Sequence, residues 1–388
     1  MVGEWAEISL GDAIELKRGY DLPSRERRDG PFPIVSSSGI SGHHAEAKAK
    51  GPGVVIGRYG TLGEVHYITE DYWPLNTALY IRDFKGNHQR FISYFLRSLD
   101  FTAYSDKAAV PGLNRNDLHT AQIVLPPLPE QYAIAHILGT LDDKIELNRR
   151  MNETLETMAR ALFKSWFVDF DPVRAKAEGQ DLGLPKHLAD LFPDSFEDSE
   201  LGEIPRGWRI TTLGELLELS YGKALKEEDR NDGTIPVFGS NGQVGWHNEK
   251  LAEGPGIIVG RKGNPGVVTW APTDFFTIDT TFYVVLKTAC RSIHFLYYAL
   301  RTHDLASLGA DSAVPGLNRN MAYLSKQVLP RPEVLTAFDS RVQSLFTRCH
   351  DLDEESRTLA ALRGTLLPKL ISGELRVKDV ERFMEKAV

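Results

Sequence analysis

The sequence predicts an α+β protein with two tandem, mostly-β domains, each followed by a long α-helix. Three observations lead to this prediction. The chain of 388 residues repeats itself at an offset of 203 to 204 positions. Within each copy, short β-branched runs alternate with Gly and Pro turns. After each copy, apolar residues recur at alternating spacings of four and three, as in a coiled coil.

The repeat is clearest in one octapeptide, AVPGLNRN, which occurs at Ala109–Asn116 and again at Ala313–Asn320. Earlier in each copy, FPIVSSSG matches IPVFGSNG, and GVVIGRYGTLG matches GIIVGRKGNPG. Two copies at this distance do not fit a solenoid, whose units are about 20 to 50 residues long. We therefore expect a duplicated domain of roughly 120 residues.

Each copy is expected to hold several strands and one packed helix. In the first copy, the runs IELKRGY, GVVIGRYG, EVHYI and ALYI are short and bounded by turn formers, as strands are. The segments QRFISYFLRSL at 89–99 and IHFLYYALRTH at 293–303 carry apolar residues at helical spacing instead.

A long helix is predicted after each domain. The first begins near Pro129 and Glu130, which are both favourable in a first helical turn. Its seam positions are Ile134, Leu138, Leu141, Ile145, Asn148, Asn152, Leu155, Ala159 and Leu162. The second begins at Pro332, and its matching seam positions are Phe338, Val342, Leu345, Cys349, Leu352, Ser356, Leu359, Arg363 and Leu366.

The two seams favour helices that pack on each other as an antiparallel coiled coil. The polar positions leave open a second interpretation, a core helix in an ordinary bundle. Asn152 and Ser356 are polar at the same layer, and such residues fix helix register at some cost in stability. Each helix should be about 55 Å long. The expected ends are breaks at Asp171–Pro172 and at Pro368.

These patterns divide the chain into consecutive segments. The predicted segments are a first domain at 1–127, a helix at 128–170, an acidic linker at 171–204, a second domain at 205–330, a helix at 331–375 and a tail at 376–388. Residues 171–206 hold nine acidic and four basic side chains, so much of the net charge of −8 lies outside the two domains. Charge therefore neither indicates nor excludes a nucleic-acid partner.

Composition and motifs exclude several classes of protein. No apolar run approaches the roughly 18 residues of a membrane span, and no secretory leader is visible. The two cysteines have no CxxC spacing, which argues against a disulfide scaffold. We expect a cytoplasmic protein. P-loop, zinc-protease and serine-hydrolase motifs are absent, so we expect no catalytic residue, metal or cofactor in this chain.

A possible metal pair, His44 and Glu46 with His247 and Glu249, lacks the Pro-Cys-x-x-Cys partner of zinc deaminases. We interpret it as an ordinary pair of loops.

The repeated turns are the candidate binding elements. Glycines flanking an arginine let backbone N–H groups and a guanidinium approach a phosphate, and Arg and Asn are common readers of bases. The alternative is a hairpin turn with a solvated arginine. For Asn116 and Asn320 we favour a helix-capping role over base reading. The candidate DNA-binding residues are Ser37, Ser38, Arg58, Tyr59, Thr61, Asn114 and Arg115, with Ser240, Asn241, Arg261, Lys262, Asn264, Asn318 and Arg319.

The repeat also sorts these candidates. Residues identical in both copies, such as Arg58 and Arg261, cannot distinguish two different sequences, so they are expected to serve folding or phosphate positioning. Residues that differ at matched loops are better candidates for base reading; these are Tyr59 with Lys262, Thr61 with Asn264 and Ser38 with Asn241.

The chain resembles the specificity (S) subunit of Type I DNA restriction–modification systems. The resemblance covers nearly the whole chain. It rests on the two VPGLNRN turns, on LPPLPEQ at Leu125–Gln131, on ALFKSWFVDFDP at Ala161–Pro172, on GEIPRGW at Gly202–Trp208 and on LLPKLISGEL at Leu366–Leu375.

The resemblance implies a function. Each domain would read one half of a split double-stranded DNA target, and the helices would set the gap. Two methyltransferase (M) subunits would bring S-adenosylmethionine, and restriction (R) subunits would bring ATP and Mg²⁺. One departure is LPRPEV at 329–334, which leaves Gln131 without a counterpart, so the two helix entrances need not contact partners equivalently. The competing hypothesis is a non-catalytic tandem adaptor that binds protein or glycan.

Overall fold

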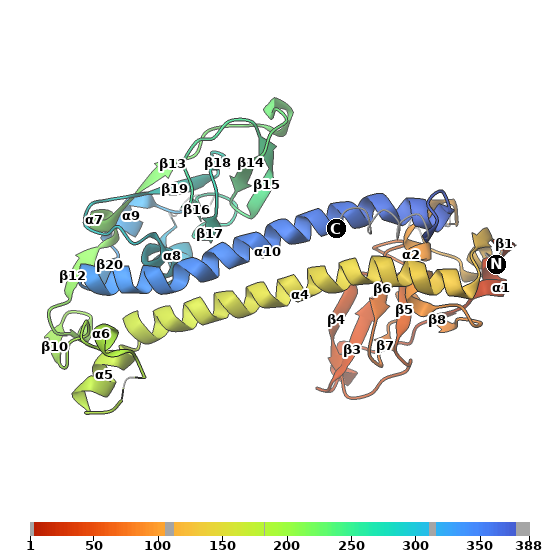
Figure 1. Ribbon diagram of the computed structural model, residues 1–388, viewed down its shortest axis with the longest axis horizontal. Helices are drawn as coiled ribbons and strands as arrows, with labels where there is room; N and C mark the ends of the chain where they lie inside the picture. The colour runs from red at the N-terminus through yellow and green to blue at the C-terminus, as the bar shows by residue number, and fades with distance from the viewer. Residues whose placement is uncertain (1–3, 105–111, 182, 310–315, 378–388) are drawn as a thin grey trace. The chain divides into compact units, whose positions relative to one another are not determined.

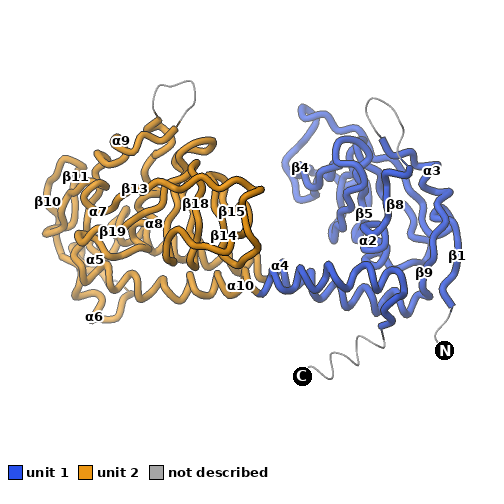
Figure 2. Tube along the Cα trace, turned by 90° about the horizontal axis from the view of Figure 1, so that it is seen from above, with its two compact units in different colours: residues 1–147, 355–388 blue, residues 148–354 orange. Residues whose placement is uncertain are grey.

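The structure is a computed structural model with two compact units, each containing one copy of the repeat (Figure 2). Unit 1 holds residues 1–147 and 355–388, and unit 2 holds residues 148–354. No helix in the described part of the chain is long and apolar enough to cross a membrane. The described residues are 4–104, 112–181, 183–309 and 316–377.

Unit 1 contains the first copy of the repeat (Figure 1). Its elements are β1 (Ala6–Ser9), α1 (Leu10–Ala13), β2 (Glu15–Arg18), η1 (Ser24–Glu26), β3 (Phe32–Ser36), β4 (Gly39–His44), β5 (Gly53–Gly57), β6 (Val65–Ile68), β7 (Trp73–Pro74), β8 (Ala78–Asp83), α2 (Gln89–Arg97), η2 (Phe101–Tyr104), α3 (Arg115–His119) and β9 (Gln122–Leu125). An antiparallel sheet is ordered β2-β8-β5-β6, and a smaller sheet is ordered β4-β3-β7. Strands β1 and β9 pair at the ends of the copy.

Unit 2 repeats this topology with the second copy. It begins with α5 (Asp171–Ala177), α6 (Lys186–Ala189) and a hairpin of β10 (Phe196–Ser199) and β11 (Gly202–Pro205). The elements of the second copy are β12 (Arg209–Thr212), α7 (Leu213–Leu216), β13 (Leu217–Tyr221), η3 (Glu227–Asp229), β14 (Ile235–Gly239), β15 (Gly242–His247), β16 (Gly256–Gly260), β17 (Val268–Ala271), β18 (Phe276–Thr277), β19 (Thr281–Leu286), α8 (Ile293–Thr302), η4 (Leu305–Leu308), α9 (Arg319–Leu324) and β20 (Lys326–Leu329). The sheets are β13-β19-β16-β17, β15-β14-β18 and β12-β20.

The two long helices are α4 (Leu128–Phe167) and α10 (Pro332–Ser372), and they pack antiparallel within each unit. In unit 1, Asp142 of α4 pairs with Arg363 of α10, and Lys144 Nζ lies 3.2 Å from Glu355 Oε2. In unit 2, Asn148 Nδ2 donates to the Leu352 carbonyl at 3.4 Å. The predicted α+β class with paired long helices is confirmed.

The predicted seam residues are buried to different degrees. Asn148 is fully buried although it is polar, because its amide donates to a backbone carbonyl of α10. The buried seam residues are Ile134, Leu138, Asn148, Ala159, Phe338, Val342 and Leu352. The half-buried ones are Leu141, Ile145, Asn152, Leu155, Leu162, Leu345, Cys349, Ser356, Leu359, Arg363 and Leu366.

Helix α10 does not end at Pro368, which corrects the expected break at this residue. The helix continues to Ser372, and the residues after the proline, Leu370 and Ile371, are buried in the core of unit 1. Proline removes one backbone hydrogen bond from a helix. Burial of two large side chains, at about 1.5 to 3 kcal/mol each, favours the continued helix.

Each core is completed by the far end of a long helix. In unit 2, Phe163 and Trp166 near the end of α4 pack against Phe338 near the start of α10. In unit 1, the matching positions at an offset of 204 are Leu367 and Leu370 of α10, and Leu370 is fully buried. Neither core is therefore made from a continuous stretch of sequence.

The segment predicted as an acidic linker, 171–204, is folded into unit 2. Its helices and hairpin bury Val173, Leu188, Phe192 and Ile204 in the same core as Trp208. Charge and turn-forming residues dominate the composition of this segment, but apolar residues spaced along it are sufficient to anchor it.

The two copies differ in how the domain contacts its helices. In unit 1, Arg90 of α2 makes two hydrogen bonds to Asp143 of α4, at 2.9 and 2.7 Å, and these bonds lower the pKa of Asp143. In unit 2, the residue that matches Arg90 is His294, whose ring lies 4.7 Å from that of Phe346 and 5.2 Å from that of Trp270. In unit 2 the Arg90–Asp143 pair is thus replaced by these aromatic contacts together with a hydrogen bond from His294 Nδ1 to Asp339 Oδ1 of α10, at 2.9 Å.

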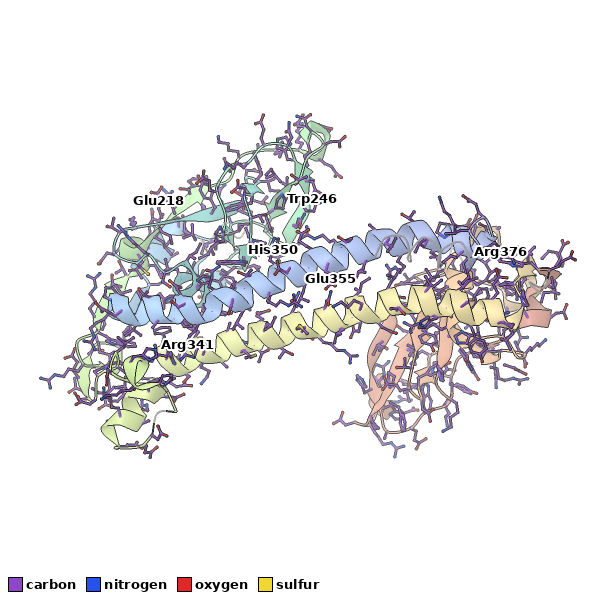
Figure 3. The ribbon with its side chains drawn as sticks, viewed as in Figure 1. Glu218, Trp246, Arg341, His350, Glu355 and Arg376 are labelled. Carbon is purple, nitrogen blue, oxygen red and sulfur yellow. The ribbon has the colours of Figure 1, made fainter. Side chains whose placement is uncertain are left out.

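Glu130, at the start of α4, ties together the two ends of the described chain in unit 1. Its carboxylate accepts a hydrogen bond from Trp5 Nε1 at 3.1 Å and pairs at 2.9 Å with Arg376, which is labelled in Figure 3. The matching residue in unit 2 is the fully buried Val334.

Gln131 is buried at 2% exposure and holds α4 on the first domain. Its Oε1 accepts from the His88 N–H at 3.0 Å, and its Nε2 donates to Asn87 Oδ1 at 2.7 Å and to the Pro126 carbonyl at 3.0 Å. The matching residue in unit 2 is the buried Leu335. Because the second copy has leucine in place of this glutamine, unit 2 lacks the hydrogen bonds that join the long helix to the domain through Gln131 in unit 1.

Replacing Gln131 with leucine should destabilise unit 1 by about 1 to 3 kcal/mol, because the His88 N–H would be left buried without an acceptor. Urea unfolding followed by hydrogen exchange of α2 and α4 measures this change. The exposed Gln122→Leu substitution is the matched control and should change stability by less than about 0.5 kcal/mol. Equal effects of the two substitutions would show that Gln131 does not hold the helix.

Candidate nucleic-acid interface

In each unit the Gly-Arg-x-Gly motif begins a closed loop after a central strand, β5 or β16. The Gly63 N–H donates to the Gly57 carbonyl at 2.8 Å, and the Gly266 N–H donates to the Gly260 carbonyl at 2.9 Å. A Cβ on Gly57 would lie 1.9 Å from a carbonyl oxygen across the loop, and Gly60 has a φ of +80°. These glycines are therefore required by the shape of the loop.

The Gly-Leu-Asn-Arg-Asn turn pairs with this loop through its backbone. In unit 1, the Leu113 N–H donates to the Arg58 carbonyl at 3.1 Å, and in unit 2 the Leu317 N–H donates to the Arg261 carbonyl at 2.9 Å. Two repeated motifs that are distant in sequence are thus one structural element. The first three residues of each octapeptide, 109–111 and 313–315, lie outside the described residues.

The serine-containing turn between β3 and β4 is the third part of this site. A Cβ on Gly60 would lie 3.7 Å from Ser37 Oγ, and in unit 2 a Cβ on Gly263 would lie 3.1 Å from Ser240 Oγ. We call the three turns together the turn cluster. It comprises residues 36–39, 57–63 and 112–116 in unit 1, and residues 239–242, 260–266 and 316–320 in unit 2.

The turn cluster brings together all fourteen candidate residues of the sequence analysis, seven in each unit. Among the described residues, none of the four arginines of the cluster forms an ion pair with a carboxylate; Arg58 and Arg261 instead donate to backbone carbonyls. The exposed candidates are Ser38, Tyr59, Thr61, Arg115, Asn241, Lys262 and Asn264. The half-buried ones are Ser37, Arg58, Asn114, Ser240, Arg261, Asn318 and Arg319.

Tyr221 also belongs to the site, although it lies outside the repeated turn motifs. Its ring, at 49% exposure, contacts two guanidinium groups, with Arg261 Cζ 4.9 Å and Arg319 Cζ 5.0 Å from the ring centre. Stacking of this kind fixes the direction of both cations. Arg18 occupies the matching position in unit 1, and comparing strand ends between the two copies would have shown this exchange.

The helix caps are Asn114 and Asn318, which corrects the proposed capping role of Asn116 and Asn320. The Asn114 side chain accepts from the Asn116 N–H at 2.9 Å, and the Asn318 side chain accepts from the N–H groups of Asn320 and Met321 at 3.0 and 3.3 Å. Helices α3 and α9 begin one residue after Asn114 and Asn318. The capping side chains are therefore those of Asn114 and Asn318, two residues before the expected ones, because they reach the free N–H groups of the first helical turn.

His44 and His247 have a structural role in their loops. Both are buried, and their Nδ1 atoms accept from the backbone N–H of Arg28 at 2.9 Å and of Asn231 at 3.1 Å. Glu46 pairs with the Arg28 side chain. Within the residues that the structure describes, no group of His, Cys, Asp and Glu side chains could hold a metal ion.

Comparison with known proteins extends this picture to a family. The family model of the Type I restriction modification DNA specificity domain matches residues 3–157 and 205–333, which include both copies of the repeat. The chain belongs to this family. The matched ranges contain the turn cluster of each unit, so each unit carries one specificity domain.

Individual members of the specificity family are similar over most of their length. The chain is 27% identical to the Type I restriction enzyme HindI specificity subunit of Haemophilus influenzae, over 70% of this chain and 73% of that protein. It is 25% identical to the MjaIX specificity subunit of Methanocaldococcus jannaschii, over 76% of this chain and 71% of that protein. The fold is similar to that of the S subunit of a Type I system from M. genitalium, with a TM-score of 0.63, 18% identity, and coverage of 95% and 96% of the two chains.

Removing either helix cap should destabilise its own unit. Asn114→Ala and Asn318→Ala are each expected to lower the free energy of unfolding by about 1 kcal/mol, because a first-turn N–H loses its acceptor. Thermal unfolding measures this effect. Asn116→Ala, at an exposed position two residues later, is the control and should have a much smaller effect. A larger loss for Asn116→Ala would restore the original assignment of the cap.

Proposed function

We propose that this chain is the DNA specificity subunit of a Type I restriction–modification system, and that each unit reads one half of a split double-stranded target. One observation carries the proposal: the same three turns gather in both units and present arginines that no carboxylate neutralises among the described residues. Unpaired guanidinium groups on a fixed backbone are suited to phosphate and base contacts.

The division of roles follows from the geometry of the turn cluster. Arg58 and Arg261 are half-buried, their backbones are fixed by the paired turn, and they are identical in both units, so we assign them to phosphate positioning. Tyr59 and Lys262, one residue later, are exposed and differ between the copies, so we assign them to base reading together with Ser38, Asn241, Thr61 and Asn264.

The continuous helices α4 and α10, of 40 and 41 residues, are proposed to set the unread gap between the two half-sites. A helix is a suitable spacer because its length is fixed at about 1.5 Å per residue. Two domains held on such a spacer read half-sites at a constant separation.

We further propose that the chain has no catalytic activity of its own and recruits its chemistry. Two M subunits would supply S-adenosylmethionine-dependent adenine methylation, and R subunits would supply ATP- and Mg²⁺-dependent translocation and cleavage. The relatives that support this proposal are themselves specificity subunits of Type I restriction enzymes.

A methylome comparison tests the function itself. Deleting the gene should remove one split, adenine-methylated motif from the genome of the source cell. Loss of no such motif, together with binding of the purified chain to a protein or glycan but not to DNA, would favour the adaptor hypothesis instead.

Removing a positioning arginine should weaken binding to every DNA sequence. In the complex with M subunits, Arg58→Ala is expected to reduce affinity for target and random duplexes by similar factors, and to lower the slope of log K against log salt by about 0.9. Fluorescence anisotropy over a salt series measures both quantities. Arg160→Ala, an exposed change on α4, is the control. Relaxed recognition at a single base would contradict the assignment of Arg58 to phosphate.

Tyr221 should act through the two arginines that it orders. Tyr221→Ala is expected to weaken DNA binding roughly fivefold, because each exposed cation–π contact contributes about 0.5 to 1 kcal/mol. Tyr221→Phe keeps the ring and should bind as the unchanged protein does. If the two substitutions weaken binding equally, the hydroxyl group itself contacts DNA and the stacking explanation fails.

A further inference from the structure

Unit 2 contains a second cationic feature, a cavity of about 660 Å³ where β12, β20 and the amino ends of α8 and α10 meet. We call it the arginine pocket, because Arg209, Arg291 and Arg331 line it. Its volume lies within the range of small-molecule sites, about 300 to 1,000 Å³. None of its lining residues belongs to the turn cluster.

The three guanidinium groups are available to a ligand. In the described part of the chain, none of them forms an ion pair with a carboxylate, and only Arg331 makes a side-chain hydrogen bond, to the Leu191 carbonyl at 2.9 Å. The one acidic side chain in the wall, Asp339, is already engaged. It accepts from Ser292 Oγ at 2.7 Å and from His294 Nδ1 at 2.9 Å.

The remaining wall suits an anion with an uncharged part. The lining side chains include the hydroxyls of Thr288 and Thr336 and an apolar surface of Leu329, Pro330 and Leu335. Burial raises the pKa of the Cys290 thiol to about 11, so this residue adds no negative charge at neutral pH.

Unit 1 has a different set of side chains at the matching positions. Ala6, Asn87 and Pro127 stand where unit 2 has its three arginines. Tyr132 replaces Thr336, and its ring packs 4.4 Å from that of His88. The three arginines are therefore a feature of unit 2 that the duplication alone does not explain.

We propose that the arginine pocket binds a phosphate-bearing anion with at least two negative charges. Three arginines that can each donate parallel hydrogen bonds match the oxygen atoms of a diphosphate better than those of a single carboxylate. The amino ends of α8 and α10 border the pocket and add the partial positive charge of a helix dipole. The phosphate would come either from a free diphosphate or nucleotide, or from the backbone of DNA.

Calorimetric titration of the full-length chain with inorganic pyrophosphate tests the proposal. The double variant Arg209→Gln and Arg291→Gln should weaken binding by roughly tenfold or more, since charged hydrogen bonds are lost. A second variant, Thr336→Tyr, fills the pocket with the side chain that unit 1 has and should also weaken binding. Arg341→Gln, on α10 outside the pocket and labelled in Figure 3, is the control and should bind as the unchanged chain does.

A random-sequence duplex, added over a salt series, identifies the source of the phosphate. If the double variant binds the duplex more weakly and pyrophosphate competes with the duplex, the pocket takes backbone phosphates. If duplex binding is unchanged while pyrophosphate binding is lost, it takes a free anion. Pyrophosphate binding that is absent, or equal in all the variants, overturns the proposal. That result would leave the turn cluster unaffected, because Arg58→Ala tests a separate set of residues.

Discussion

The antiparallel pairing of α4 with α10 is the contact on which both units depend. Each unit places one copy of the repeat on the start of one helix and completes its core with the end of the other. Trp166 of α4 is buried in unit 2 against Phe338, and Leu370 of α10 is buried in unit 1. A domain that needs both helices for its core cannot fold without bringing the distant segments of the chain together.

The duplication keeps the backbone and varies the side chains. Both units retain the loop glycines, the backbone pairing of the two turns, and the asparagine caps, because these contacts determine the fold of the turn cluster. The residues that differ between the two units at matching positions face solvent or pack against a neighbouring element. Tyr221 takes the place of Arg18. His294, with its aromatic neighbours and its hydrogen bond to Asp339, takes the place of Arg90 and its ion pair. The two units thus share one scaffold and differ in the side chains that it carries.

Much of this structure could be predicted from the sequence, because the repeat and the seam are strong periodic patterns. The α+β class, the two domains and the paired helices follow from them, and the candidate residues of the turns gather in the turn cluster of each unit. Where the structure differs from the prediction, interactions of particular residues explain the difference. Pro368 does not stop α10, since burial of the residues beyond it outweighs one lost hydrogen bond. The acidic segment folds because a few apolar residues anchor it. The cap positions depend on where the helix begins, and Tyr221, which contacts two arginines of the turn cluster, lies outside the repeated motifs.

Zero-length cross-linking tests the helix pairing most directly. Lys144 Nζ and Glu355 Oε2 are 3.2 Å apart in unit 1, although 211 residues separate them in the chain. A carbodiimide should therefore join these two side chains, and mass spectrometry of an equal mixture of light- and heavy-nitrogen protein should show the linked peptides within one chain. Linked peptides that combine light with heavy nitrogen, or no Lys144–Glu355 link at all, would contradict the account.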